Sequence, residues 1–401
     1  MITRPLLEHI FSAASIERWN DHPHPAVFTE LGKQAHKMVI AWVLGKYEED
    51  HSPAGINWLA LIEGGIFEFL HRVVVTDIRP PVFHKLMQNK ETRMQLSDWV
   101  FQKLERDLTS LSAEFAVRFR EYHRCEAQSM ERRILKAAHF LATKWEFDFI
   151  LHWSAGMYGI EQTKKEIENQ TEDLDVSIAK EMLLTPTSSK LWGFISLVGQ
   201  LTFQKRWAQT SRIPQTSVLG HLLFVAVVSY LVSMEIGAKP RRAYNNFFCG
   251  LFHDLPEVLT RDIVSPVKAS VEGLDELIHH YEREAMEGRV FPLIPKHWGD
   301  ELRYYTEEEF TNKTWQEDHV DPLQRHKGDI PDDLCGGKFN PLDGRLIEVC
   351  DKLAAYMEAS VSIQMGIHPQ PLEDGKRNIY DRYSQTVLYG YPVGQLFDLF
   401  R

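Results

Sequence analysis

Gly250-Leu-Phe-His-Asp-Leu-Pro-Glu-Val-Leu-Thr-Arg-Asp262 combines a helical apolar pattern with potential metal ligands. Its apolar residues, from Leu251 to Leu259, recur at helical spacing. His253 and Asp254 lie side by side in the sequence, and the acid Glu257 follows one turn later. This combination predicts a hydrolytic site on a buried helix, provided that further ligands come from other parts of the chain.

Length and charge restrict the class of protein. A chain of 401 residues is long for one hydrophobic core and suits two domains. Its 45 Lys and Arg against 56 Asp and Glu give a net charge of −11, which disfavours general binding of nucleic acid or of an anionic membrane. A local basic pocket for one small phosphate is still compatible with this balance.

The sequence predicts no membrane segment. The longest apolar run, Leu222–Met234, has 13 residues, fewer than the roughly 20 that span a bilayer. The first residues carry a charge before any apolar region and do not resemble a secretory signal. The four cysteines show no C-x-x-C spacing, so we expect reduced thiols and a cytoplasmic location.

Frequent i, i+3, i+4 apolar patterns predict an all-α fold. The loop composition of Thr185-Pro-Thr-Ser-Ser189 predicts a boundary between domains 1–188 and 189–401. The expected helices are Glu30–Lys46, Trp58–Val75, Arg93–Phe119, Met130–His152, Lys164–Leu184, Leu191–Gln204, Ser217–Ile236, Arg241–Thr260, Leu274–Glu287 and Leu342–Met365. The charged region from Glu282 to Asp333 is interpreted as a solvated insertion, in which Glu301–Glu309 forms either a lid or a surface helix.

The second half of the sequence aligns with the first, which predicts an internal duplication. Three pairs of segments establish the alignment, and a fourth pair, Asp77–Val82 with Asp262–Val267, extends it. The three pairs are Arg18-Trp19 with Arg206-Trp207, Leu31-Gly32-Lys33 with Leu219-Gly220-His221 at the same offset, and Ile66–Leu70 with Leu251–Leu255 after a shift of three residues. Ala138–Ala142 can also be set against Cys350–Ala354. We expect two tandem helical domains related by an approximate two-fold axis.

The first copy lacks the residues that would bind a metal. Lys33, Glu68, Phe69 and His139 stand where the second copy has His221, His253, Asp254 and Asp351. The N-terminal domain is therefore predicted to be degenerate and to pack against the other as a second subunit would. The duplication then mimics a dimer, and the sequence leaves the oligomeric state open.

His221 and Asp351 complete a set of two imidazoles and two carboxylates. Such a set holds one first-row divalent cation, with Mn, Co, Fe, Ni and Zn as the alternatives, and leaves positions for water and substrate oxygens. The cation would lower the pKa of bound water and neutralise charge on a phosphoryl group. Taken singly, His221 also fits a core histidine, Asp351 a helix N-terminal charge and Arg206 a solvated surface residue.

Phe203–Ile367 resembles the HD-domain metal-dependent phosphohydrolases, and among them the bacterial 5′-deoxyribonucleotidase branch. The resemblance is carried by Arg206-Trp207, Ser217–His221, Leu251–Asp262, Pro266-Val267-Lys268 and Asp351-Lys-Leu. It implies an HD-like fold for the second half, which the internal alignment extends to the first, and metal ligation by His221, His253, Asp254 and Asp351. It also implies that Glu257 and Asp262 assist water attack or protonate the leaving oxygen, that Arg206 binds the phosphate, and that Trp207 shapes the nucleotide pocket.

The helical spacing agrees with the role of Glu257, which is i+4 from His253 and i+3 from Asp254 and so falls on the metal-facing side of one helix. Arg206 offers a planar bidentate donor for phosphate. One position departs from the branch, because Gly220 stands where an acidic residue commonly precedes the first histidine. This departure puts the support of His221 and the exact substrate in doubt.

We therefore expect a metal-dependent phosphoric ester hydrolase that acts on a small nucleotide, such as a 5′-(deoxy)nucleoside monophosphate. Two alternatives stay open at this point. One is a nucleotide-binding regulatory protein with little turnover, and the other is a phosphodiesterase or triphosphohydrolase of the same superfamily.

Overall fold

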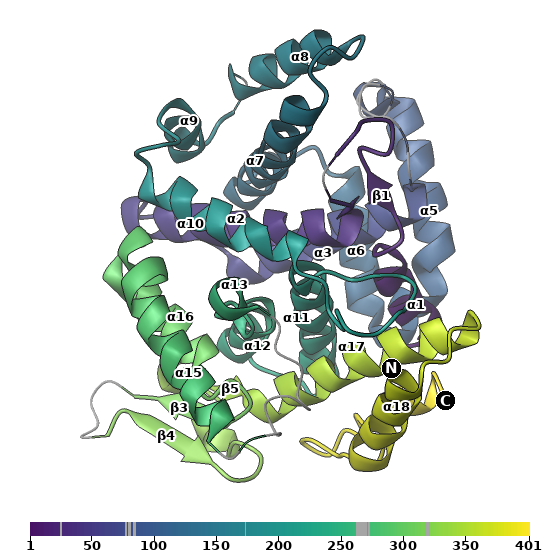
Figure 1. The fold of residues 1–401 in the computed structure, drawn as a ribbon, viewed down its shortest axis with the longest axis vertical. Coiled ribbons are helices and arrows are strands. Elements are labelled where there is room, and N and C mark those ends of the chain that lie inside the picture. Colours follow the sequence, from purple (N-terminus) through teal and green to yellow (C-terminus); the bar gives the residue numbers. More distant parts are fainter. Residues whose placement is uncertain are drawn as a thin grey trace.

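The structure is a computed structural model. It describes residues 1–401 apart from 25, 77, 79–81, 83–85, 173, 262–270, 272 and 317–320. Within the described residues there are 17 α-helices and two small antiparallel sheets (Figure 1). The prediction of an all-α fold is confirmed.

The first half of the chain contributes eight helices and one short sheet among its described residues. β1 (Glu17–Arg18) pairs with β2 (Phe28–Thr29). The helices are α1 (Arg4–Ser12), α2 (Glu30–His51), α3 (Trp58–Val75), α5 (Lys90–Leu111), α6 (Ala113–Arg124), α7 (Met130–Trp153), α8 (Ile160–Glu172), α9 (Ser177–Leu184) and, beginning the second half, α10 (Lys190–Gly199).

The second half continues with the helices that carry the candidate ligands. They are α11 (Val218–Glu235), α12 (Pro240–Phe252), α13 (Glu257–Thr260), α15 (Leu274–Ala285), α16 (Lys296–Thr306), α17 (Gly344–Gln364), α18 (Gln370–Tyr383) and α19 (Gln395–Asp398). The short turns are η1 (Gln200–Phe203), η2 (Met286–Val290), η3 (Phe291–Leu293), η4 (Asp332–Leu334) and η5 (Gly337–Phe339). β3 (Asn312–Trp315) pairs with both β4 (Leu323–His326) and β5 (Leu342–Asp343).

Helices α2 and α11 pack against each other at the centre of the molecule. In both helices nearly every residue of the first four turns is buried. α11 is the one described helix that is long and apolar enough to cross a membrane, but 89% of its apolar window is buried inside the protein. Its apolar surface is covered by the chain itself, as in a core helix, and one buried hydrophobic cluster runs through both halves.

Local geometry recurs between the halves at the aligned positions. Thr29 and Ser217 cap α2 and α11, and their hydroxyls accept hydrogen bonds from Gly32 N at 3.2 Å and Gly220 N at 3.1 Å. Before each helix the chain makes the same antiparallel contact, Glu17 with Thr29 and Lys205 with Ser217. Trp19 and Trp207 both adopt positive φ, 58° and 56°, a conformation that non-glycine residues seldom adopt.

Three expected helices are interrupted. Arg93–Phe119 divides into α5 and α6 at Ser112, whose hydroxyl accepts from Phe115 N at 3.2 Å and starts a new helix. Lys164–Leu184 divides into α8 and α9, and Arg241–Thr260 divides into α12 and α13. The expected helix Leu342–Met365 begins two residues later, because Leu342 and Asp343 form β5.

The interpretation of residues 282–333 as a solvated insertion was wrong for much of this region. α16 packs against α12 and buries Trp298, Leu302 and Tyr305. Tyr305 donates to Asn245 at 3.1 Å, which ties α16 to α12. The region therefore contributes to the core that supports the candidate site.

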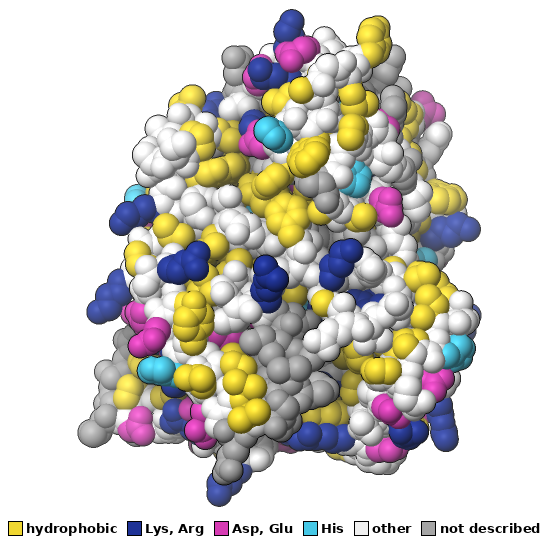
Figure 2. Space-filling view, viewed as in Figure 1, with side chains coloured by type: hydrophobic (Ala, Val, Ile, Leu, Met, Phe, Trp, Pro, Cys, Tyr) yellow, Lys and Arg dark blue, Asp and Glu magenta, His cyan; other side chains and the backbone are white. Residues whose placement is uncertain are grey.

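Charged and apolar side chains are interspersed on the face shown in Figure 2. Lys and Arg side chains are scattered over this face, and acidic side chains lie mainly above and below those at its centre. Among the described side chains of this face, the basic residues do not merge into one continuous surface, in keeping with the acidic composition.

Candidate metal centre

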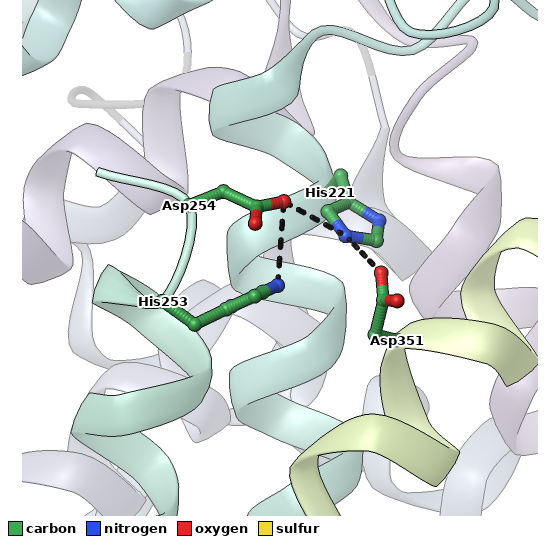
Figure 3. Close-up of side chains that lie close together, drawn as sticks. All are labelled: His221, His253, Asp254 and Asp351. Carbon is green, nitrogen blue, oxygen red and sulfur yellow. Dashed lines mark ion pairs between the residues drawn. The ribbon is translucent and has the colours of Figure 1, made fainter. Parts of the chain in front are cut away.

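Four predicted ligands from three helical elements meet at one point. His221 lies at the start of α11, His253 caps the C-terminus of α12, Asp254 follows it, and Asp351 lies in α17 (Figure 3). One ligand atom from each residue lies within 4.8 Å of the others. It is the one such group of His, Cys, Asp and Glu side chains found in the described part of the chain.

Close approach of two helices brings the histidines together. Gly250 of α12 lies on the backbone of α11, where an added Cβ would be 2.8 Å from Ala226 Cα. The missing side chain lets α12 approach α11, and the rings of His221 and His253 have centroids 5.7 Å apart. α12 then ends at Phe252, and Pro256, which has no backbone N–H, lies in the turn before α13.

The two carboxylates lie between the imidazoles. His221 Nε2 is 3.0 Å from Asp351 Oδ1 and 3.8 Å from Asp254 Oδ2, and His253 Nε2 is 3.3 Å from Asp254 Oδ2 (Figure 3). His221, His253 and Asp351 are buried, and Asp254 is partly exposed. The cluster is therefore enclosed by protein on most sides and reachable next to Asp254.

Burial and charge set the protonation of these groups. Burial and the nearby Arg206 lower the pKa of His221. Burial opposes charge on His253, but Asp254 and Asp351 outweigh it and raise the pKa of His253 to about 9. Burial would raise the pKa of Asp351, yet Lys352 and His221 hold it well below its usual value. Binding of a cation would release the proton from His253, because a ligating imidazole is neutral.

The donor set fits a divalent transition-metal ion. Nε2 of His221 and Nε2 of His253 are buried, and neither makes a hydrogen bond of good geometry within the described residues. His253 Nδ1 donates to Gly250 O at 3.0 Å, which fixes the tautomer with Nε2 free for a metal. Two nitrogen and two oxygen donors at this spacing suit a first-row cation, whose identity the donors do not determine.

His221 has no comparable support. Its Nδ1 is buried without a hydrogen-bond partner among the described residues. At the preceding position, a Cβ on Gly220 would lie 3.3 Å from Leu31 Cγ of α2. An acidic side chain there would have to displace Leu31, so the packing of the two halves accounts for the glycine.

The structure brings Arg206 to the cluster. Its Nη1 lies 3.6 Å from Asp254 Oδ2, and its Nη2 lies 3.8 Å from Asp351 Oδ1. The neighbouring Trp207 is half-buried and donates from Nε1 to Glu358 Oε2 at 2.8 Å. Its ring lies against α18, where a Cβ on Gly375 would be 2.9 Å from it.

Glu257 does not share one uninterrupted helix with His253, so that part of the prediction was wrong. Glu257 is the first residue of α13, and its side chain is partly buried. The backbone nevertheless stays tightly coiled through the turn, since Glu257 N donates to Asp254 O at 3.1 Å. Asp262 and the motif Pro266-Val267-Lys268 lie outside the described residues.

Two residues beside the cluster are missing from the prediction. Lys352 Nζ lies 2.7 Å from Asp351 Oδ2, and Glu358 contacts Trp207 as described above. A signal for Glu358 was present in the sequence, because it follows Asp351 at the spacing by which Glu146 follows His139. Extending the aligned segment Ala138–Ala142 by four residues would have paired the two acids.

The corresponding positions of the first half form a different cluster. The Lys33 amine contacts the His139 ring, with Nζ 3.2 Å from Nε2, and Lys37 pairs with Glu68. Burial and Arg18 lower the pKa of Lys33 well below its usual value. A buried amine thus lies where the aligned residue of the second half is His221.

Residues 198–380 match the family model described as the HD domain. No curated protein matches the sequence. The matched segment contains all four clustered residues together with Arg206, Trp207 and Glu257. Residues 198–380 are thus similar to the HD domain, and this matched segment holds the buried His/Asp cluster that could bind a metal ion.

Proposed function

We propose that the protein removes phosphate from a small nucleotide, with a 5′-(deoxy)nucleoside monophosphate as the substrate. The observation that carries this proposal is the guanidinium of Arg206, which faces two of the four clustered ligands at 3.6 and 3.8 Å. A cation site beside a planar bidentate donor suits the oxygens of one terminal phosphate. The partly exposed Asp254 marks the side from which such a phosphate would approach.

In this proposal His221, His253, Asp254 and Asp351 hold one divalent cation. The cation supplies Lewis-acid chemistry, which activates water and offsets phosphoryl charge. Arg206 binds the phosphate oxygens, and Trp207 forms a wall for the nucleoside. Glu257 and Asp262 accept and return protons, which requires each carboxylate to come within hydrogen-bonding reach of the reacting oxygens.

The same proposal assigns residues 1–188 and 189–401 to two related HD-like units, of which only the second is catalytic. It is supported by the paired helix caps, the paired strand contacts and the positive φ of Trp19 and Trp207. The contact between α2 and α11 is the kind of contact that a symmetric dimer makes about its axis.

The test is phosphate release from a panel of nucleoside monophosphates, diphosphates and triphosphates with Mn²⁺ or Co²⁺. We expect release from at least one monophosphate, loss of at least about 100-fold in Glu257→Ala, and no activity in the double variant His253→Ala, Asp254→Ala. Glu68→Gln, at the first-half position aligned with His253, is the matched control and should retain activity.

Other outcomes would replace this proposal. Activity that survives in the double variant would remove the proposed site. Cleavage of a diester, or release of triphosphate, would assign a different reaction to the same cluster. Tight nucleotide binding without a product under either metal would favour a regulatory protein.

A further inference from the structure

Glu358 is a buried acid that contacts the residues next to the metal centre. It lies in α17, seven residues after Asp351, and is 1% exposed. Its Oε2 accepts a hydrogen bond from Trp207 Nε1 at 2.8 Å and lies 3.5 Å from Arg206 Nε. Its Oε1 accepts from the Thr216 hydroxyl and lies 3.6 Å from Arg212 Nη2.

These contacts keep Glu358 ionised. Burial alone would raise the pKa of this carboxyl, but Arg212 and Arg206 outweigh burial and lower the pKa to about 2. The carboxylate thus carries a negative charge between two guanidiniums. Removing that charge would leave two buried or half-buried cations with less compensation, which is costly in a low-dielectric interior.

The contact orients the Arg206 guanidinium. Its Nε edge faces Glu358, while Nη1 and Nη2 face Asp254 and Asp351. A guanidinium is planar, so a partner at one edge fixes the direction of the other. Arg206 therefore approaches the metal centre in the orientation that Glu358 sets, and Trp207 is held by the same oxygen.

In the first half, a glutamate makes the same contacts with the aligned Arg-Trp pair, but the metal ligands are absent. Glu146 Oε2 accepts from Trp19 Nε1 at 2.8 Å and lies 2.9 Å from Arg18 Nε. Arg18 also pairs with Glu30 at 3.0 Å. Glu146 thus makes the same contacts with an Arg-Trp pair as Glu358 and has none of the four proposed metal ligands beside it.

We propose that Glu358 is a positioning residue, which acts on the substrate phosphate through Arg206 and on the nucleoside through Trp207. This inference rests on the proposed phosphohydrolase function. In the variant Glu358→Gln the amide oxygen still accepts from Trp207, but the charge that orients Arg206 is lost. The variant therefore separates positioning of Arg206 from packing of the helix.

The experiment is a double-mutant cycle on kcat/KM with Glu358→Gln and Arg206→Ala. Glu358→Gln should lower kcat/KM by about 10- to 100-fold, as misplacement of a binding group does. The double variant should lie within about threefold of Arg206→Ala alone, because Glu358 has no effect once its target is absent. Glu146→Gln, which disrupts the equivalent contacts with Arg18 and Trp19, should keep kcat/KM within about twofold of the unmodified protein.

If the losses of kcat/KM in the two single variants multiply in the double variant, the inference is overturned, because Glu358 then acts without Arg206. Unchanged kcat/KM in Glu358→Gln, or an equal loss in Glu146→Gln, would do the same. If Glu358→Gln is not recovered as folded protein, Thr216→Val replaces it. This variant removes one hydrogen bond to the carboxylate and should lower kcat/KM by about fivefold, again only when Arg206 is present.

Failure of the proposed function gives a different result. Protein that hydrolyses no nucleotide but binds inorganic phosphate with Mn²⁺ would contradict the proposed function alone, and the cycle is then measured on phosphate affinity by calorimetry. The inference is supported if Glu358→Gln weakens phosphate binding when Arg206 is present and has no effect when Arg206 is replaced. Protein that neither hydrolyses a nucleotide nor binds phosphate overturns both.

Discussion

Gly250 places the second-half site where two helix backbones touch. The aligned Gly65 of α3 also lies against its neighbouring helix, but there a Cβ would meet Met38 Sδ and Cε, the flexible end of a side chain. The second half has Ala226 at the position aligned with Met38, and its backbone atoms are the ones that a Cβ on Gly250 would meet. Two equivalent glycines thus differ in how easily their surroundings adjust.

This difference predicts unequal effects of the same substitution. Gly250→Ala should lower the free energy of unfolding by about 1–3 kcal/mol, because two backbones must separate. It should also weaken metal binding, since His253 follows Gly250 by one turn and its Nδ1 bonds Gly250 O. Gly65→Ala should cost less and leave metal binding unchanged.

Denaturant unfolding and titration with Mn²⁺, carried out on both variants, measure the two effects. Equal losses of stability in the two variants, or unaltered metal affinity in Gly250→Ala, would contradict the role given to this close approach.

The residues of the site were predictable where they belong to an ordered motif. His221, His253, Asp254 and Asp351 were all found in the sequence, and the structure brings them together. Lys352 and Glu358 were missed because neither residue stands out by type or spacing within one half, and the contact of Glu358 with Trp207 joins segments far apart in the chain. Only a longer alignment of the two halves would have marked Glu358.

At the scale of elements, α2 and α10 meet at a buried histidine. His36 of α2 donates from Nε2 to Ile195 O of α10 at 2.9 Å. Burial outweighs this favourable contact and lowers the pKa of His36 from 6.5 to about 4. The folded protein therefore keeps His36 neutral at a pH at which the unfolded chain protonates it.

This pKa difference predicts loss of stability in mild acid. The contribution of His36 is complete above about pH 6.5 and declines as the pH falls towards 4, because only the unfolded chain takes up the proton in that range. At pH 5 the loss relative to neutral pH is about 2 kcal/mol from this one group. His36→Gln keeps an N–H donor but does not titrate. Between pH 7.5 and pH 5 its free energy of unfolding should fall by about 2 kcal/mol less than that of the unmodified protein.

The measurement is urea unfolding of both proteins at the two pH values. Since His71 and other buried histidines titrate in the same direction, only the difference between the proteins reports on His36. The same pH dependence in both would show that His36 does not contribute.

The sequence predicted which segments form helices better than it predicted where those helices are interrupted. Trp58–Val75 was predicted with both of its ends because its apolar pattern is strong, and in the structure the Asn57 side chain caps its start. The breaks at Ser112 and at Pro256 leave the periodic apolar pattern nearly intact, so the pattern alone did not reveal them. Strands β3 and β4 were missed because they are short and their charged composition resembles a surface loop.

At the scale of the whole molecule, only the second half is predicted to bind a metal ion. The first half has Lys33, Glu68, Phe69 and His139 at the positions aligned with the four ligands, so it offers no comparable donor set. We expect one divalent ion per chain, absent from the variant His253→Ala, Asp254→Ala. Mass spectrometry of the metal-loaded protein measures the ratio, and two ions per chain would contradict the assignment of a single site.

The same ion should stabilise the fold. A cation at 100 times its dissociation constant adds about 2.7 kcal/mol to the free energy of unfolding if it binds only the folded state. The melting temperature should therefore fall when a chelator is added to the unmodified protein and stay constant in the double variant. A chelator effect of equal size in both would place the stabilising ion elsewhere.

Under the proposed duplication, the contact between α2 and α11 also bears on how two related units would diverge. In a dimer of identical chains every substitution appears twice, so a residue that one subunit needs for chemistry is fixed in the other as well. In the proposed duplication, joining the two units through the segment after α9 would remove that constraint and make their association independent of protein concentration. Each unit could then change alone, and the proposed catalytic unit would carry its partner as a permanent part of its own scaffold.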